Sequence, residues 1–260
     1  PMMLGLMQGR LLPPVNNHIQ EFPNQWKDEF DILDECDLQC IEWLITTNSL
    51  SSNPALKSPN MLDGLSISSV CVDTLVDERI NDPKYLRSSL VPLCSSITAH
   101  HFTKTVTIPL LEASSMQDKI KRAAFIKNIT DIADMFPSIN FSFEAELGIK
   151  ELKEIVSLRD NFLVTYDTGN ITSFGLDHEE YIRAFSNKIN NVHLKDRTFD
   201  ANTVEPGLGD TDFKKIFATL RNINYSGPFI LQTARSDSGK EKDTILRHIQ
   251  YFGALYEKLI

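Results

Sequence analysis

The chain has 260 residues, of which 42% are hydrophobic and 23% charged, as in ordinary soluble globular proteins. Its formal charge of -9 argues against a nucleic-acid partner, because binding along the phosphates needs a basic surface. No apolar run approaches the roughly 18 residues of a membrane-spanning helix, so no membrane partner is expected. Residues 1–7 are too short for a signal sequence, and the four cysteines form no CxxC pair. We therefore expect a cytoplasmic protein with free thiols.

Eight apolar segments of strand length follow one another along the chain, separated mostly by amphipathic segments of helix length. The predicted strands are residues 2–7, 38–45, 65–72, 104–111, 140–146, 162–170, 191–197 and 229–235. The predicted helices are residues 24–37, 82–101, 115–136, 149–158, 178–187, 212–223 and 240–259. Residues 46–60 and 198–209 are expected to be loops.

The long helix over residues 115–136 allows a more detailed prediction. Its periodicity predicts that Ile120, Ala124, Ile129 and Ile132 face the core. Either Ser114 or Ser115 is expected to cap its N-terminus.

Eight strands alternating with helices predict a single-domain (β/α)8 TIM barrel over residues 1–260, since this fold uses about 250 residues. A doubly wound sheet has the same alternation but usually fewer strands. The chain also lacks the G-x-G-x-x-G turn of that fold after its first strand.

Four polar side chains end the last four predicted strands: Glu144, Asp167, His193 and Gln232. Parallel strands bring their C-terminal ends to one face, so these groups are expected to converge. Carboxylate, imidazole and amide ligands suit a divalent cation such as Mn²⁺, Mg²⁺, Co²⁺ or Zn²⁺. Glu146 is the alternative to Glu144, because it lies on the same strand face. Glu42 and Asp73 are weaker candidates.

Four motifs resemble the xylose isomerase-like barrel superfamily of sugar isomerases and epimerases. They are Met-Gln-Gly-Arg at 7–10, Tyr-Asp-Thr-Gly-Asn at 166–170, Val-His-Leu-Lys-Asp-Arg at 192–197 and Glu-Pro-Gly-Leu-Gly-Asp at 205–210. The superfamily includes ketose 3-epimerases, hydroxypyruvate isomerases, inosose dehydratases and the endonuclease IV branch. The resemblance implies that the ends of strands five to eight bind one metal ion and that the substrate is a small sugar, sugar phosphate or polyol.

The chain departs from this pattern at strand eight, where the resemblance implies a glutamate and the sequence has Gln232. An amide oxygen can bind a metal ion, but an amide cannot take up a proton. An epimerase of this family that exchanges protons between two glutamates through an ene-diolate could not work unchanged. Three readings remain open: an isomerase or epimerase with other proton carriers, an inosose-type dehydratase with one base, and a non-catalytic sugar-binding barrel.

The remaining site predictions concern proton transfer and substrate contacts. Proton transfer is predicted for Glu144, with Lys195, Glu112 or a metal-bound water as a second carrier. Arg10 and Arg235 follow strands one and eight, which meet when a barrel closes, so they either form an anion pocket or pair with Glu42 and Glu112. The predicted substrate contacts are Gln8, Arg10, Asn170, Arg197 and Arg235. The sequence leaves open the sugar, the metal and the formation of a homo-oligomer.

Overall fold

The computed structural model describes residues 2–259, so the two end residues of the predicted domain lie outside it. Eight parallel strands form a closed barrel in the order β1-β10-β7-β6-β5-β4-β3-β2, which confirms the predicted fold class. These strands are β1 (Leu4–Met7), β2 (Cys40–Ile45), β3 (Ile67–Val72), β4 (Thr105–Leu110), β5 (Asn140–Ala145), β6 (Phe162–Asp167), β7 (Ile189–Leu194) and β10 (Phe229–Leu231).

The chain divides into two compact units whose boundaries fall inside strands β2 and β6. One unit runs up to Glu42 and resumes at Tyr166, and the other spans Trp43–Thr165. The prediction that residues 1–260 form one domain stays a prediction. No helix within residues 2–259 has the length and apolar character needed to cross a membrane.

The unit from Trp43 to Thr165 packs aromatic rings on one face of its strands. Phe143 of β5 contacts Phe125 and Phe162 edge-on, with ring centroids 6.1 and 5.2 Å apart. On the opposite face, the hydroxyls of Ser142 and Thr165 lie 2.6 Å apart. Since side chains alternate along a strand, Glu144 shares the polar face with Ser142.

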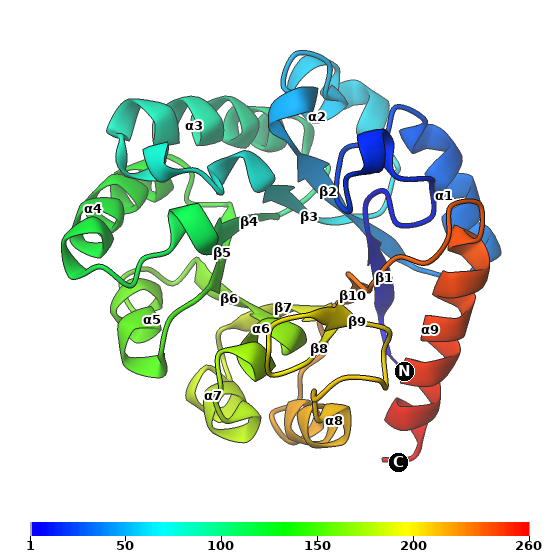
Figure 1. The fold of residues 1–260 in the computed structure, drawn as a ribbon. Coiled ribbons are helices and arrows are strands. Elements are labelled where there is room, and N and C mark those ends of the chain that lie inside the picture. The colour runs from blue at the N-terminus through cyan, green and yellow to red at the C-terminus, as the bar shows by residue number, and fades with distance from the viewer. Residues whose placement is uncertain (1, 260) are drawn as a thin grey trace. The chain divides into compact units, whose positions relative to one another are not determined.

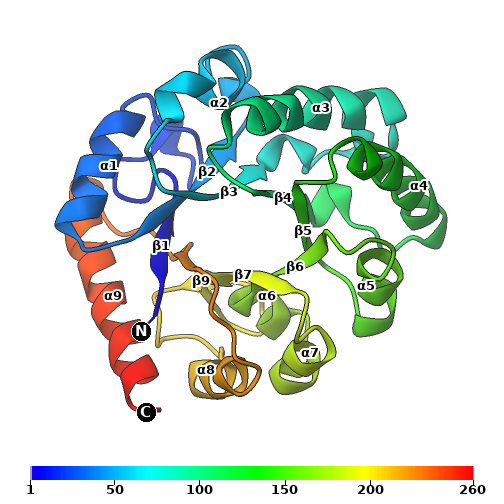
Figure 2. The same ribbon diagram turned by 180° about the vertical axis from the view of Figure 1, so that it is seen from behind.

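Helices cover the aromatic face of this unit. They are α2 (Pro54–Lys57), α3 (Pro83–His100), α4 (Lys119–Met135) and α5 (Ile149–Val156), and Figures 1 and 2 show α3 and α4 beside β4 and β5. Helix α3 begins at Pro83, where a missing N–H costs nothing, and it contains Pro92. The predicted loop over residues 46–60 instead contains α2 and two 3-10 turns.

Helix α4 corrects two predictions. Ile129 and Ile132 are buried as expected, but Ile120 is 83% exposed and Ala124 is exposed. The helix begins at Lys119 and is capped by Asp118, whose Oδ1 accepts hydrogen bonds from the N–H groups of residues 120 and 121, and not by Ser114 or Ser115. Ile120 therefore lies in the first turn, away from the apolar face that the later residues bury.

The other unit joins β1, β10 and β7, with Leu4 opposite Phe229 and Phe229 opposite Val192. Its helices are α1 (Trp26–Glu35), α6 (Thr168–Ser173), α7 (His178–Ala184), α8 (Phe213–Asn222) and α9 (Glu241–Glu257). The rings of Phe217 contact Phe229 and Phe252 at 5.7 and 6.2 Å, which packs β10 against α8 and α9.

Two short elements differ from the sequence prediction in this unit. The sixth strand was predicted to reach residue 170, but β6 ends at Asp167 and α6 begins directly after it. The predicted loop over residues 198–209 contains β9 (Thr203–Val204), which pairs antiparallel with β8 (Asp196–Arg197). This hairpin follows β7 and carries Arg197 on its first strand.

Candidate functional site

Strand β7 places Asn191 and His193 on one face, because the two residues are separated by two positions. His193 is fully buried, and its Nε2 lies 2.9 and 3.0 Å from the two carboxylate oxygens of Glu42, which is also fully buried. Asn191 donates from Nδ2 to the same carboxylate at 2.6 Å. Because a carboxylate only accepts, Nε2 of His193 carries the proton and Nδ1 is left with a lone pair.

Asp167 ends β6 and lies in front of this imidazole. Its Oδ1 accepts the backbone N–H of Asn170 at 2.9 Å, as the N-cap of α6. Its Oδ2 lies 3.8 Å from Nδ1 of His193 and 3.3 Å from Nζ of Lys195, and it accepts no hydrogen bond from residues 2–259. Burial favours a higher pKa for Asp167, but the charge of Lys195, the neighbouring His193 and the Asn170 N–H together hold the pKa well below the ordinary value. The side chain is an anion ready to bind a cation.

Glu144 is the last-but-one residue of β5 and is only 5% exposed. Glu146, the alternative, lies beyond the strand and is half-buried. Ligand atoms of Glu144, Asp167 and His193 lie within 4.8 Å of one another, and all three residues are buried. This group can hold a metal ion. The Glu144 carboxylate, the Asp167 oxygen without a hydrogen bond and the lone pair of the His193 imidazole fit a divalent cation chemically.

Lys195 and Asp196 are neighbours in the sequence but have different contacts. Lys195 has a 12% exposed side chain that faces Asp167, and its backbone is held by Thr168, whose Oγ1 accepts from Lys195 N–H at 2.9 Å. Asp196 accepts the N–H groups of Gly207, Gly209 and Thr211 at 2.9, 3.0 and 3.2 Å. Asp196 therefore shapes the loop after the hairpin, while Lys195 is available at the site.

That loop requires a residue without a side chain at 209. A Cβ on Gly209 would lie 2.3 Å from Oδ1 of Asp196 and 2.8 Å from the carbonyl oxygen of Arg197. Gly209 of the 205–210 motif thus allows the close packing of this loop against the hairpin.

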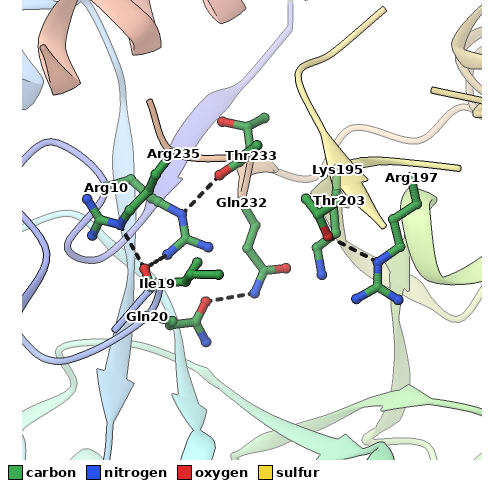
Figure 3. A pocket seen from close by; sticks show the side chains of 10 residues that line it. Arg10, Ile19, Gln20, Lys195, Arg197, Thr203, Gln232, Thr233 and Arg235 are labelled. Atoms are coloured by element: carbon green, nitrogen blue, oxygen red, sulfur yellow. Dashed lines mark hydrogen bonds between the residues drawn. The ribbon is translucent and has the colours of Figure 1, made fainter. Parts of the chain in front are cut away.

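Gln232 follows β10 and donates from Nε2 to Oε1 of Gln20 at 2.8 Å. Its own Oε1 is buried and has no hydrogen-bond partner among the described residues. Its predicted role as a metal ligand stays a prediction. The side chain lines a cavity of about 440 Å³, together with Arg10, Lys195, Arg197 and Arg235 (Figure 3).

Arg10 and Arg235 hold the loop after β1 against the end of β10. Arg235 donates to the carbonyls of Gly9, Leu12 and Ile19, each at 2.8 Å. Arg10 donates to Ile19 O at 2.7 Å and to Thr233 O at 3.2 Å. Both guanidinium groups line the cavity, but many of their donors are used by the backbone. Of the expected pairings, Glu42 is bonded to His193 and Asn191, and Arg235 binds carbonyl oxygens.

Glu29 of α1 also holds the loop after β1. This fully buried carboxyl accepts Gly9 N–H at 2.8 Å and Leu11 N–H at 3.0 Å. Burial raises the pKa of Glu29 to about 7, although the two backbone donors and the charges of Arg235 and Arg10 work in the opposite direction.

The remaining predicted site residues are Gln8, Asn170 and Glu112. Gln8 is buried, and its N–H donates to the carbonyl of Glu42 at 3.0 Å. Asn170 is buried, and its Oδ1 has no hydrogen-bond partner among residues 2–259. Glu112 is exposed in a 3-10 turn after β4, with a φ of 52°. The roles predicted for these three residues stay predictions.

Sequence reasoning missed Gln20, Asn191 and Thr203. Asn191 had a usable signal, because it lies two residues before His193 on the same strand. Gln20 lies in an irregular loop and Thr203 in a two-residue strand, so no periodicity marks them.

The chain is similar to known proteins in sequence over part of its length and in fold over nearly all of it. Inosose dehydratase of Clostridium tetani is 33% identical over 112 residues, which covers 35% of this chain and 37% of that protein. Inosose dehydratase of Geobacillus thermodenitrificans is 31% identical over 108 residues, covering 33% and 36%. The chain thus spans little more than a third of the length of these relatives.

Solved structures match over nearly the full chain. A structure of the IOLI protein with a bound zinc atom has a TM-score of 0.74 at 17% identity, covering 100% of this chain and 99% of that one. D-allulose 3-epimerase from Methylomonas sp. has a TM-score of 0.74 at 14% identity, covering 98% of both chains. At these identities the likeness shows the fold alone. A model of the xylose isomerase-like TIM barrel matches residues 98–254, more than half of the sequence. The chain belongs to the xylose isomerase-like TIM barrel family.

Proposed function

We propose that this protein is a divalent-metal-dependent isomerase that acts on a small polyhydroxylated aldehyde or ketone. The observation that carries the proposal is the buried group of Glu144, Asp167 and His193, whose ligand atoms lie within 4.8 Å of one another. A bound divalent ion would supply a Lewis acid for the oxygen atoms of the substrate. Mn²⁺, Mg²⁺, Co²⁺ and Zn²⁺ all accept this donor set.

The reaction begins with loss of a proton from the carbon next to the carbonyl. Glu144 is the base that we assign, because a carboxylate can take up a proton and the other carboxylate, Asp167, has a lowered pKa and faces Lys195. Lys195 is the acid that we assign: it donates a proton to the carbonyl oxygen and takes one back from the neighbouring hydroxyl, while Glu144 returns its proton to the adjacent carbon. Asp167 holds Lys195 at 3.3 Å, and Glu42 orients His193 through Nε2.

Gln232 decides between isomerisation and epimerisation in this proposal. Epimerisation inverts one carbon, so the proton must leave on one face and return on the other. An amide cannot accept or release that proton, so Gln232 cannot serve the second face. An aldose–ketose shift moves the proton between adjacent carbons on one face and needs one base.

Dehydration is the second candidate, and it is favoured by the sequence identity to inosose dehydratases. It shares the first step: the C–H bond breaks and Glu144 takes the proton. The C–O bond at the next carbon then breaks, and hydroxide leaves as water with a proton from Lys195. This route also needs only one base.

A cytoplasmic location is part of the proposal. It is supported by four cysteines, all of which are buried as free thiols and fit a reducing compartment.

Hydrogen exchange in D₂O tests the proposal. The Mn²⁺-loaded protein is incubated with a panel of aldoses, ketoses and inososes, and deuterium on carbon is followed by NMR. Exchange with at least one sugar is expected in the native protein and in Glu146→Gln, and it should be lost in Glu144→Gln. A rise in the ultraviolet absorbance of an enone would identify dehydration.

Three results are informative in other ways. Absence of exchange with every sugar, together with sugar binding, would support the non-catalytic barrel. Exchange that survives in Glu144→Gln but is lost in Glu146→Gln would move the base to Glu146. Epimer formation by the native protein would contradict the argument from Gln232.

A further inference from the structure

The cavity beside Gln232 differs in charge from the rest of the molecule. The whole chain has a net charge of -9, yet every ionisable side chain that lines this cavity among the described residues is basic: Arg10, Lys195, Arg197 and Arg235. Figure 3 shows the two basic pairs on opposite sides of Gln232. An acidic protein that gathers four cations around one cavity favours an anion there.

Arg197 is the cation that is best placed to bind a ligand. Its Nε donates to Oγ1 of Thr203 at 3.3 Å and its Nη1 to Oγ of Ser173 at 3.4 Å, and both contacts are long. Within residues 2–259 it forms no ion pair with a carboxylate. By contrast, Lys195 faces Asp167, and Arg235 donates to three carbonyl groups.

The backbone of Arg197 is held in place by the second strand of the hairpin and by the loop that follows it. Arg197 pairs with Thr203 across β8 and β9, and its carbonyl accepts Asp210 N–H at 2.8 Å. The guanidinium therefore stands on a fixed base. A planar guanidinium with free N–H groups can bind carboxylate or phosphate through two hydrogen bonds at once.

The second observation is the orphaned acceptor at the centre of the cavity. Gln232 is 8% exposed, and its Oε1 has no hydrogen-bond partner among the described residues. A buried acceptor of this kind needs a donor, and an anionic group such as carboxylate has none to offer. A hydroxyl group supplies one.

We propose that this cavity binds the anionic end of a polyhydroxylated substrate, with the carboxylate or phosphate on Arg197 and a neighbouring hydroxyl donating to Oε1 of Gln232. The inference rests on the proposed function in that it deepens the substrate class: sugar acids or sugar phosphates in place of neutral sugars. Gln232 suits this task because a carboxylate at its position would repel the anion.

Calorimetric binding with three probes on one carbon skeleton tests the inference. D-glucitol is neutral, D-gluconate carries a carboxylate and D-glucitol 6-phosphate carries a phosphate. We expect at least one of the two anions to bind the Mn²⁺-loaded protein at least about 10-fold more tightly than glucitol. A charge-assisted hydrogen bond contributes enough binding free energy for such a difference. The anion that binds more tightly identifies the group that the cavity prefers.

Two variants and a control separate the roles. Arg197→Gln should weaken the anion about 10- to 100-fold and leave glucitol unchanged. Gln232→Ala should weaken all three probes. Arg183→Gln removes an exposed arginine that pairs with Glu179 on α7, and it should change none of the affinities.

The outcome is decisive in either direction. Equal affinity for glucitol and the anions, or no binding of either anion at millimolar concentration, would overturn the inference. Equal loss of all probes in Arg197→Gln would assign the residue to the folding of the hairpin instead. Binding is measured without turnover, so the two proposals can fail separately. Anion preference without hydrogen exchange would contradict only the proposed reaction. Hydrogen exchange of neutral sugars without anion preference would contradict only the anion site.

Discussion

Asp167 and Glu29 are both buried carboxylates in the unit that carries β1, β7 and β10, yet they behave in opposite ways. Asp167 is 2% exposed and Glu29 is fully buried, and both accept backbone N–H groups. Lys195 lies 3.3 Å from Asp167, whereas Glu29 forms no ion pair among the described residues. The pKa of Asp167 is lowered, and burial raises that of Glu29 to about 7.

The difference shows that burial alone does not make a carboxylate functional. Burial penalises the charged form of both groups, so the outcome depends on the cations that each one faces. Asp167 stays ionised and keeps an oxygen without a hydrogen bond, as a metal ligand requires. Glu29 has a pKa near neutral pH and ties the loop after β1 to α1.

The largest effect is expected when the charge of Asp167 is removed. Asp167→Asn keeps the shape of the side chain but loses the anion, so Mn²⁺ affinity should fall by more than about 100-fold, beyond the usual loss for an outer-shell residue. Electron paramagnetic resonance of free Mn²⁺ measures this affinity. A thermal melt serves as a control for folding, and a folded variant with near-native affinity would contradict the assignment of Asp167 as a ligand.

Removing the charge of Glu29 should act on stability and not on metal binding. The pKa of Glu29 rises on folding from 4.5 to about 7, so its stabilising contribution is complete below pH 4.5 and is lost as the pH rises through 7. A change of that size corresponds to about 3 kcal/mol. Relative to the native protein, Glu29→Gln should therefore gain up to about 3 kcal/mol of stability between pH 4.5 and pH 8.

Urea unfolding at a series of pH values measures this gain. His178 and His248, whose pKa values burial lowers to about 4, titrate in the same range but are present in both proteins, so their contribution cancels in the difference. Parallel pH profiles for the native protein and Glu29→Gln would show that Glu29 is ionised in the folded state.

A smaller effect is expected at Glu42, which touches the proposed metal ligand His193 and is not itself one of the group. Glu42→Gln still offers an oxygen to Nε2 of His193 but no negative charge, so Mn²⁺ affinity should fall about 10- to 100-fold. Glu42→Asp, which keeps the charge, should recover part of that loss. Unchanged affinity in Glu42→Gln would limit Glu42 to packing.

The strands were predictable because their apolar runs are local. β5 and β6 were expected to begin at residues 140 and 162, and they do. The approach of Asp167 to His193 was predicted from the rule that parallel strand ends meet. The predicted burial of Ile120 was wrong because helical periodicity does not show where the first turn of the helix begins. That point depends on Asp118 as the N-cap.

Contacts between side chains that are far apart in the sequence were not predictable in the same way. Gln20 reaches Gln232 across 212 residues, and Glu42 reaches His193 across 151. No local pattern marks either pair, and Glu42 is only a weaker candidate in the sequence. The bond to His193 appears only when β2 and β7 take their places.

The order of apolar and polar residues along the chain was enough to predict a barrel of parallel strands and to name the side chains at their ends. It could not show which carboxylates carry charge, because ionisation depends on burial and on cations that are distant in sequence. The sequence alone does not distinguish Asp167 from Glu29, since both are acidic residues. Lys195 lies beside Asp167 and not beside Glu29, and this difference in folded geometry and electrostatics separates the proposed metal ligand from the loop anchor.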